Sequence, residues 1–296
     1  MYLSIWLGIT LATSQTGCSV SNMQLPSLSR PQAPVMLAPA PAPTPSYGVG
    51  TNPPAYVPNV PPAGARVRYS SVTTDEPVLA MTFDDGPHPT LTPQLLDILK
   101  QRNIKCTFFV IGKSAAQYPA IMRRIVAEGH EVANHTWTHP SLTSKSDAQI
   151  RTELQKSEEA ILRITGVRPR LLRPPYGATN RRIEQWIYND FGYSTIMWSV
   201  DPQDWRRPGV SVVTSRLVNG AHKGAIMLAH DIHPPTIAAM PAMFDQLLAK
   251  GYRFVTVSQL MNIEKSNAPL GVVVRPAIPV SDIEDNAGAA PKERKS

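Results

Sequence analysis

The sequence is poor in cysteine and lacks the motifs of the common nucleotide-binding folds. Two cysteines occur in 296 residues. Cys18 lies near the start of the chain and Cys106 lies within the apolar segment KCTFFVIG, so their surroundings do not suggest a structural disulfide. Neither the GxGxxG pattern nor a P-loop is present, and the sequence therefore gives no support for a nucleotide site.

Acidic residues are missing from the first part of the chain. No aspartate or glutamate occurs before Asp75, and the segment 31–64 has no charged residue at all. Many of the 30 prolines lie in that segment, which predicts an extended spacer and not a packed core. The net charge of +7 is modest for this length, and no cluster of lysine and arginine with interleaved aromatic residues occurs, which argues against a nucleic acid partner.

These changes in composition divide the chain into four parts. The first residues, MYLSIWLGITLA, form an apolar run that is too short to span a bilayer but is typical of an export signal. Gly17-Cys18 resembles the end of a bacterial lipoprotein box, so a lipid anchor at Cys18 is an alternative to simple secretion into the envelope or periplasm. The expected parts are an export segment (1–22), a disordered proline-rich linker (23–66), one folded domain (67–265) and a disordered tail (266–296).

Short apolar runs alternate with helical patterns between Pro77 and Leu260. The runs are VLAMTF, CTFFVIG, HEVANH, RLLRPP, STIMWSV, AIMLAH and RFVTVS, and five helical patterns lie between them. Strands separated by helices predict an α/β fold with a parallel sheet and right-handed crossovers. The pattern alone leaves two architectures open, a doubly wound open sheet and a (β/α) barrel.

The helical patterns carry signals for their ends. Thr92-Pro93 is typical of a helix cap followed by proline at the first helical position. Glycines that follow helical patterns are expected at helix ends, and they are Gly129, Gly166, Gly192 and Gly251.

Polar residues stand at the ends of five predicted strands. They are Asp84 and Asp85, His135 and His139, Arg173, Asp201 and Asp204, and His230. In α/β folds the carboxyl ends of parallel strands meet at one rim, where sites are built. The sequence therefore predicts a single site at this rim.

The residue types at the rim indicate metal-assisted acid–base chemistry. His135 and His139 are four residues apart, so on a helical turn both imidazoles would face one metal. A strand-end carboxylate would complete a set of two histidines and one carboxylate with open positions for water and substrate. Two adjacent acids then suggest two roles, because an acid that coordinates the metal cannot freely accept a proton.

Other rim residues fit supporting roles. His230 lies on a different strand from the histidine pair and fits either a general acid or a group that positions a metal ligand. Arg173 could orient a carboxylate, and the prolines after it would stiffen a backbone whose N–H could bind an oxyanion. Trp205 follows two acids and is expected to stack on a sugar ring.

These residues carry a resemblance to a known family. The segment from about Glu76 to Ile263 resembles the polysaccharide deacetylases of the NodB-homology type, carbohydrate esterase family four. Its five motifs occur in order as TFDDGP (82–87), HTWTH (135–139), RPPY (173–176), DPQDW (201–205) and LAH (228–230). The resemblance implies a distorted (β/α) barrel with about seven parallel strands in a single catalytic domain. It also implies a divalent metal, zinc above all, with cobalt or another divalent metal as alternatives.

The resemblance also implies a role for each motif residue. Asp85, His135 and His139 would ligate the metal. Asp84 would be the general base and Arg173 would orient it; His230 would be the general acid, and Asp201 would tune it. The backbone N–H of Tyr176 would stabilise the oxyanion, and the substrate pocket would be formed by Trp205, Leu228, Pro174 and Tyr176. No motif residue is missing, so the resemblance gives no sign of an inactive relative.

The expected activity is removal of N-acetyl groups from N-acetylglucosamine residues of a polysaccharide, with peptidoglycan first in an envelope protein. The same motifs also fit a chitin or chitooligosaccharide deacetylase and an O-acetyl xylan esterase, because they specify acetyl removal and not the glycan. A reading from another class is a glycan-binding envelope protein without turnover. The expected partner is an N-acetylated glycan, a membrane would be contacted only through Cys18, and no protein partner is predicted.

Overall fold

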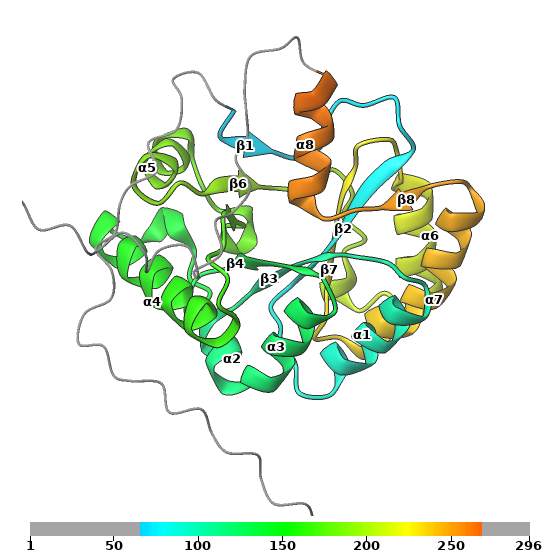
Figure 1. Ribbon diagram of the computed structural model, residues 1–296, viewed down its shortest axis with the longest axis horizontal. Helices are drawn as coiled ribbons and strands as arrows, with labels where there is room; N and C mark the ends of the chain where they lie inside the picture. The colour runs from blue at the N-terminus through cyan, green and yellow to red at the C-terminus, as the bar shows by residue number, and fades with distance from the viewer. Residues whose placement is uncertain (1–65, 268–296) are drawn as a thin grey trace, which may run out of the picture. The chain divides into compact units, whose positions relative to one another are not determined.

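Figure 1 shows the computed structural model, which describes residues 66–267. The predicted export segment with Cys18 lies outside the described residues, as do almost all of the predicted linker and tail. The described residues all belong to one compact unit of the chain. None of the helices in this part of the chain is long and apolar enough to cross a membrane.

Within residues 66–267, eight short strands form one sheet, and the pairings between these strands are all parallel. The strands are β1 (Arg68–Tyr69), β2 (Val78–Asp84), β3 (Thr107–Val110), β4 (Glu131–Asn134), β5 (Leu171–Leu172), β6 (Ser194–Ile196), β7 (Ile226–His230) and β8 (Arg253–Phe254). Their order is β1-β6-β5-β4-β3-β2-β7, and β8 pairs with β2 beside this path. The seven predicted strands are confirmed, and β1 was missed because two residues show no periodicity.

The two ends of the sheet are joined by bridges beyond the named strands. Val200, which follows β6, forms a parallel bridge with Met227 of β7, and Leu228 donates a hydrogen bond to the Val200 carbonyl at 2.9 Å. Ser71, which follows β1, forms an antiparallel bridge with Ala225. These bridges close the ring of strands. Of the two architectures that the sequence pattern left open, the protein therefore has the distorted (β/α) barrel.

Helices α1 to α7 lie outside the strands in Figure 1. The helices are α1 (Leu91–Gln101), α2 (Gly112–Gln117), α3 (Pro119–Ala127), α4 (Asp147–Thr165), α5 (Arg181–Phe191), α6 (Val210–Gly220), α7 (Pro234–Ala249) and α8 (Val257–Asn267). The five predicted helices are α1, α3, α4, α5 and α7. Helix α6 was missed because its sequence VSVVTSRLVNG is rich in β-branched residues, which favour strands when packing does not decide.

Strand β2 shows how the core is divided. Its seven residues are all buried, and successive side chains point to opposite faces. Leu79 and Met81 pack outward against the helices, whereas Val78 and Ala80 pack in the barrel interior with Leu260 of α8. Helix α8 thus covers the amino-terminal end of the interior. Following the same alternation, Thr82 and Asp84 face the interior near its other end, where the site lies.

One predicted helix end is wrong and the glycine ends are confirmed. Helix α1 begins at Leu91, and Thr92 is not its cap. The Thr92 hydroxyl instead accepts a hydrogen bond from the backbone N–H of His88 at 2.7 Å and donates one to Asp231. The four predicted glycines all follow helices with positive φ, and Gly166 and Gly192 are the C-caps of α4 and α5.

Candidate metal centre and active site

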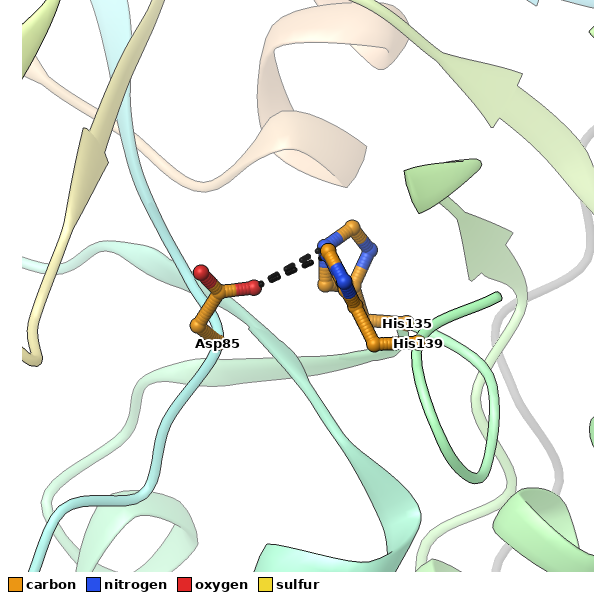
Figure 2. A group of neighbouring side chains, drawn as sticks. All are labelled: Asp85, His135 and His139. Atoms are coloured by element: carbon orange, nitrogen blue, oxygen red, sulfur yellow. Dashed lines mark ion pairs between the residues drawn. The ribbon is translucent and has the colours of Figure 1, made fainter. Parts of the chain in front are cut away.

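The backbone at the end of β2 separates the two adjacent acids. Asp84 is the last residue of β2 and is buried, with 3% of its surface exposed. Asp85 leaves the strand with a φ of 75°, in the left-handed region that non-glycine residues rarely adopt, and the Gly86–Pro87 peptide bond that follows is cis. The turn at Asp85 breaks the alternation of the strand, and its carboxylate points toward two imidazoles in Figure 2.

The two imidazoles come from a loop and not from a helical turn, which corrects the expected geometry. His135 follows β4, and both Thr136 and His139 have positive φ, 66° and 63°. The Thr136 hydroxyl accepts a hydrogen bond from the backbone N–H of His139 at 3.0 Å. Glu153 of α4 accepts from the backbone N–H groups of Trp137 and Thr138, at 2.9 and 2.7 Å. The loop is therefore fixed by side-chain acceptors that replace the hydrogen bonds of a helix.

Asp85, His135 and His139 converge on one point (Figure 2). Oδ1 of Asp85 lies 3.4 Å from Nε2 of His135 and 3.2 Å from Nε2 of His139, and one potential ligand atom from each residue lies within 4.8 Å of the others. Oδ1 is buried and accepts no hydrogen bond from the described residues. Burial opposes ionisation of Asp85, but its contacts with the two imidazoles outweigh burial and hold its pKa below the usual range.

This donor set fits a divalent metal ion. Two imidazole nitrogens and one carboxylate oxygen are ligands that suit zinc and cobalt. Nδ1 of His135 lies 2.7 Å from the carbonyl oxygen of Arg173, so a proton on Nδ1 would leave the Nε2 lone pair free for a metal. The buried Oδ1 of Asp85 accepts no hydrogen bond within the described residues and faces two ring nitrogens, an arrangement that fits a cation site.

Arg173 is completely buried and binds Asp84. One of its Nη1 hydrogen bonds goes to Oδ1 of Asp84 and another to the hydroxyl of Thr82, both at 2.7 Å. Its other nitrogens donate to the carbonyls of Ile196 and Met197, at 3.1 and 3.0 Å. Oδ2 of Asp84 lies 3.8 Å from Nε2 of His135, so Asp84 adjoins the cluster of Asp85, His135 and His139 while Arg173 holds its other oxygen.

His230, the last residue of β7, is held by Asp204 and not by Asp201. Its Nδ1 lies 2.8 Å from Oδ1 of Asp204, whose other oxygen accepts from the backbone N–H of His230 and from the hydroxyl of Thr236, each at 2.8 Å. Asp201 is exposed, and its carboxylate accepts from the backbone N–H of Gln203 at 2.7 Å. The predicted tuning role of Asp201 is therefore wrong, and the sequence offered no signal to choose between two acids after the same strand.

The charge state of His230 follows from this contact. Burial lowers the pKa of His230, but the hydrogen bond and the charge of Asp204, with Asp84 and Asp85 further off, outweigh burial and raise it to about 9. The imidazole is therefore held as a cation at neutral pH, which is the form of a proton donor.

The predicted substrate-binding residues differ in exposure. Tyr176 is 72% exposed, has a φ of 60°, and its ring lies 4.6 Å from that of His139. Trp205 is 51% exposed, and the guanidinium of Arg206 covers its ring at 4.6 Å. Pro174 and Leu228 are buried. The two aromatic side chains thus offer surface to a ligand, whereas Pro174 and Leu228 shape the interior behind them.

Sequence reasoning missed three residues around the site. Thr82 binds Arg173, Glu153 binds the histidine loop, and Asp231 is fully buried directly after His230. For Asp231 a signal existed, since it also follows a strand end. Thr82 and Glu153 gave none, because one lies within an apolar strand and the other on a charged helix surface.

Comparison with known proteins gives a consistent result. A family model described as polysaccharide deacetylase matches residues 71–196. The peptidoglycan-N-acetylglucosamine deacetylase PgdA of Listeria monocytogenes is 42% identical over 182 residues, which are 62% of this chain and 38% of that protein. The chitooligosaccharide deacetylase of Bradyrhizobium sp. is 37% identical over 216 residues, covering 68% of this chain and 98% of that protein.

A solved structure supports the same grouping. The Bc1960 peptidoglycan N-acetylglucosamine deacetylase superposes with a TM-score of 0.62 at 33% identity, covering 66% of this chain and 92% of that one. The chain spans less than half of the length of the Listeria relative. The similarity to that relative is therefore a similarity to one part of a longer protein.

Proposed function

The chain belongs to the polysaccharide deacetylase family. From that premise we propose that it is a metal-dependent hydrolase that removes N-acetyl groups from N-acetylglucosamine residues of a polysaccharide. The proposed substrate is peptidoglycan. The observation that carries the proposal is the convergence of Asp85, His135 and His139 beside the buried pair of Asp84 and Arg173. Ligands and base are then separate groups, as the chemistry requires.

Asp85, His135 and His139 would hold the metal, and zinc is proposed, with cobalt or another divalent ion as alternatives. When bound, such a metal polarises the acetyl carbonyl and makes water a stronger acid. The closeness of the three ligand atoms supports this assignment, as does the buried Oδ1 of Asp85, which faces both imidazoles and accepts no hydrogen bond within residues 66–267.

Asp84 is proposed as the general base. Arg173 holds Oδ1, so Oδ2 is the atom that would take a proton from the water that attacks the carbonyl carbon. The guanidinium is fixed by two carbonyls and the Thr82 hydroxyl, which keeps the carboxylate from rotating. A base oriented in this way does not have to be reorganised during the reaction.

His230 is proposed as the general acid. Because Asp204 occupies Nδ1, the proton that leaves would be the one on Nε2. It would go to the sugar nitrogen as the carbon–nitrogen bond breaks, giving acetate and a free amine. The backbone N–H of Tyr176 would stabilise the oxyanion, and Trp205, Leu228, Pro174 and the Tyr176 side chain would contact the acetyl group and the sugar.

Two alternatives act on the same site. A chitin or chitooligosaccharide deacetylase is favoured by the likeness to the Bradyrhizobium protein, and an O-acetyl xylan esterase would use the same groups. A glycan-binding protein without turnover is the reading from another class. A complete set of ligands, base and acid counts against it.

The proposed location is the cell envelope, after export, with a lipid anchor at Cys18 as an option. The relatives named for peptidoglycan support an envelope location. A palmitate analogue supplied to a bacterial host that expresses the full chain tests the anchor. Absence of label on the protein, with label on a known lipoprotein in the same cells, would reject it.

Acetate release from peptidoglycan, chitooligosaccharides and acetylated xylan, before and after chelation, tests the activity. We expect the highest rate on peptidoglycan, loss of the rate on chelation and recovery with Zn²⁺. Faster release from another glycan would reassign the substrate. If the protein binds these glycans but releases acetate from none of them, it is a glycan-binding protein without catalytic activity.

A further inference from the structure

Asp231 is a buried carboxyl group that the proposed reaction does not use. It follows His230 at the end of β7 and is completely inaccessible to solvent. Oδ2 accepts a hydrogen bond from the hydroxyl of Thr92, while Oδ1 has no hydrogen-bond partner among the described residues. Burying a carboxyl group with an unsatisfied oxygen costs free energy, so a buried group of this kind requires a structural or functional explanation.

The carboxyl group lies against Gly86. A Cβ atom on Gly86 would sit 2.4 Å from both oxygens of Asp231 and 2.7 Å from its Cγ, closer than real Cβ contacts come. In the parallel ladder Asp84 is paired with His230, so the residues after each strand end are also neighbours. Asp231 therefore occupies the space beside the turn that follows Asp85, and any side chain at position 86 would displace it.

Thr92 joins Asp231 to the same turn from the other side. Its hydroxyl accepts from the backbone N–H of His88 at 2.7 Å, while its proton goes to Asp231. The ring of His88 in turn accepts from the backbone N–H groups of Thr90 and Leu91, at 3.3 and 3.2 Å. The segment between β2 and α1 is thus fastened to β7 through Thr92 and Asp231.

Asp85 needs such support because its backbone is in an unfavourable region. A φ of 75° is strained for an aspartate, and strained residues persist where neighbouring contacts fix them. Its Oδ1 must stay near Nε2 of both His135 and His139 for the three groups to share one ion. A small rotation of the turn at Gly86 would carry Oδ1 away from that point.

We propose that Asp231 is a positioning residue: its buried carboxyl group, held by Thr92, fixes the turn at Gly86 and keeps the Asp85 carboxylate aimed at His135 and His139. The inference rests on the proposed metal centre. Asp231 would contact the turn that carries Asp85 and not the metal itself. It would therefore change metal affinity by changing the position of the Asp85 carboxylate.

Metal affinity of the full chain, measured without substrate, tests the inference. The metal-free protein is titrated with Co²⁺, and binding is followed by the visible absorption of the bound ion. We expect Asp231→Ala to weaken Co²⁺ binding by about tenfold or more, the size of effect typical of groups behind metal ligands. Asp231→Asn keeps the shape and an acceptor for Thr92, and we expect it to restore most of the affinity.

Thr92 offers a second pair of variants. Thr92→Val removes the hydroxyl at nearly constant volume and should weaken Co²⁺ binding, whereas Thr92→Ser should not. If Asp231→Ala does not fold, this pair carries the test. Glu131→Ala is the matched control, because Glu131 is a carboxylate bound by Thr107 and Ser258 at the opposite end of β4. It should lower the unfolding midpoint and leave Co²⁺ affinity unchanged.

The outcomes separate the two claims. Wild-type affinity in Asp231→Ala, or an equal loss in Glu131→Ala, would overturn the positioning role and leave the metal centre intact. Failure of the wild-type protein to bind Co²⁺ or Zn²⁺ would overturn the metal centre and the inference together.

Discussion

His230 Nδ1 and Asp204 Oδ1 lie 2.8 Å apart, and the second oxygen of Asp204 binds both the backbone of His230 and the hydroxyl of Thr236. The carboxylate is thus held at both oxygens and cannot rotate without losing a buried hydrogen bond. Asp204 fixes the orientation of the His230 ring and stabilises its protonated form. Because Nδ1 is bound, Nε2 is the nitrogen that would donate a proton in the proposed reaction. One aspartate therefore sets the orientation and the charge of the proposed acid.

Replacing Asp204 should reduce turnover far more than replacing Asp201. We expect Asp204→Ala to lower kcat for acetate release by about 100-fold or more, because a positioned acid contributes about 10²–10⁴-fold. Asp201→Ala removes an exposed carboxylate bound to the Gln203 backbone and should leave kcat within about threefold. Initial rates of both variants decide the matter, and an equal loss in the two would contradict the assignment to Asp204.

The stability of the metal-free protein should fall as the pH rises from about 6.5 to about 9. The folded protein keeps the His230 proton up to about pH 9, whereas the unfolded chain releases it near 6.5. The stabilisation is therefore complete below 6.5 and lost as the pH passes through 9. Urea unfolding at pH 7, 8 and 9 measures this change. Asp204→Asn should show a smaller loss over that window, and equal losses in the two proteins would refute the linkage.

Breaking the buried pair of Arg173 and Asp84 should destabilise the fold. Arg173→Met leaves the Asp84 carboxylate buried without its cation, which typically costs about 3–5 kcal/mol. Arg182 is the control, since it pairs with Asp147 through two hydrogen bonds of 2.9 Å on the surface, and Arg182→Met should change stability little. Urea unfolding in the presence of a chelator compares them. Similar losses in both variants would show that burial of the pair is not what matters.

Asp84 and Asp85 should separate turnover from metal binding. Asp84→Asn should lower kcat by about 10²–10⁴-fold while Co²⁺ still binds, because the amide cannot accept the proton but the three ligands remain. Asp85→Asn should weaken Co²⁺ binding and remove the rise in unfolding temperature that Zn²⁺ gives the wild-type protein. Absorption titrations and thermal unfolding with and without Zn²⁺ measure both effects. The division of roles fails if Asp84→Asn loses the metal or Asp85→Asn keeps it.

Two glycines with nearly the same φ should respond differently to alanine. Gly224 precedes β7 with a φ of 73°, and a Cβ there would lie 2.0 Å from the carbonyl oxygen of Val72. Gly166 caps α4 with a φ of 72° and has nothing within 4 Å of that position. Gly166→Ala should cost about 1–2 kcal/mol, the strain of the left-handed region alone. Gly224→Ala should cost at least twice as much in urea unfolding, and a cost no larger than that of Gly166→Ala would contradict the predicted clash.

Local patterns predicted most of the fold because they reflect local physics. The apolar run VLAMTF is buried on both faces as β2, and the helix-ending glycines adopt positive φ as expected. Predictions failed where packing overrides propensity. Helix α6 forms from β-branched residues because it packs against α7, and Thr92 gives its hydroxyl to Asp231 instead of capping α1.

By itself, the sequence determined the alternation of strands and helices and placed polar residues at the strand ends. Both follow from periodicity within a few residues. The tertiary structure alone decided that Asp204 and not Asp201 holds His230, a contact between residues 26 apart, and that Asp231 meets Thr92 across 139 residues. Such pairings depend on how strands order themselves in the barrel. Chemically equivalent candidates on one strand end are distinguished only by backbone geometry, which in this protein turns Asp204 inward and leaves Asp201 in solvent.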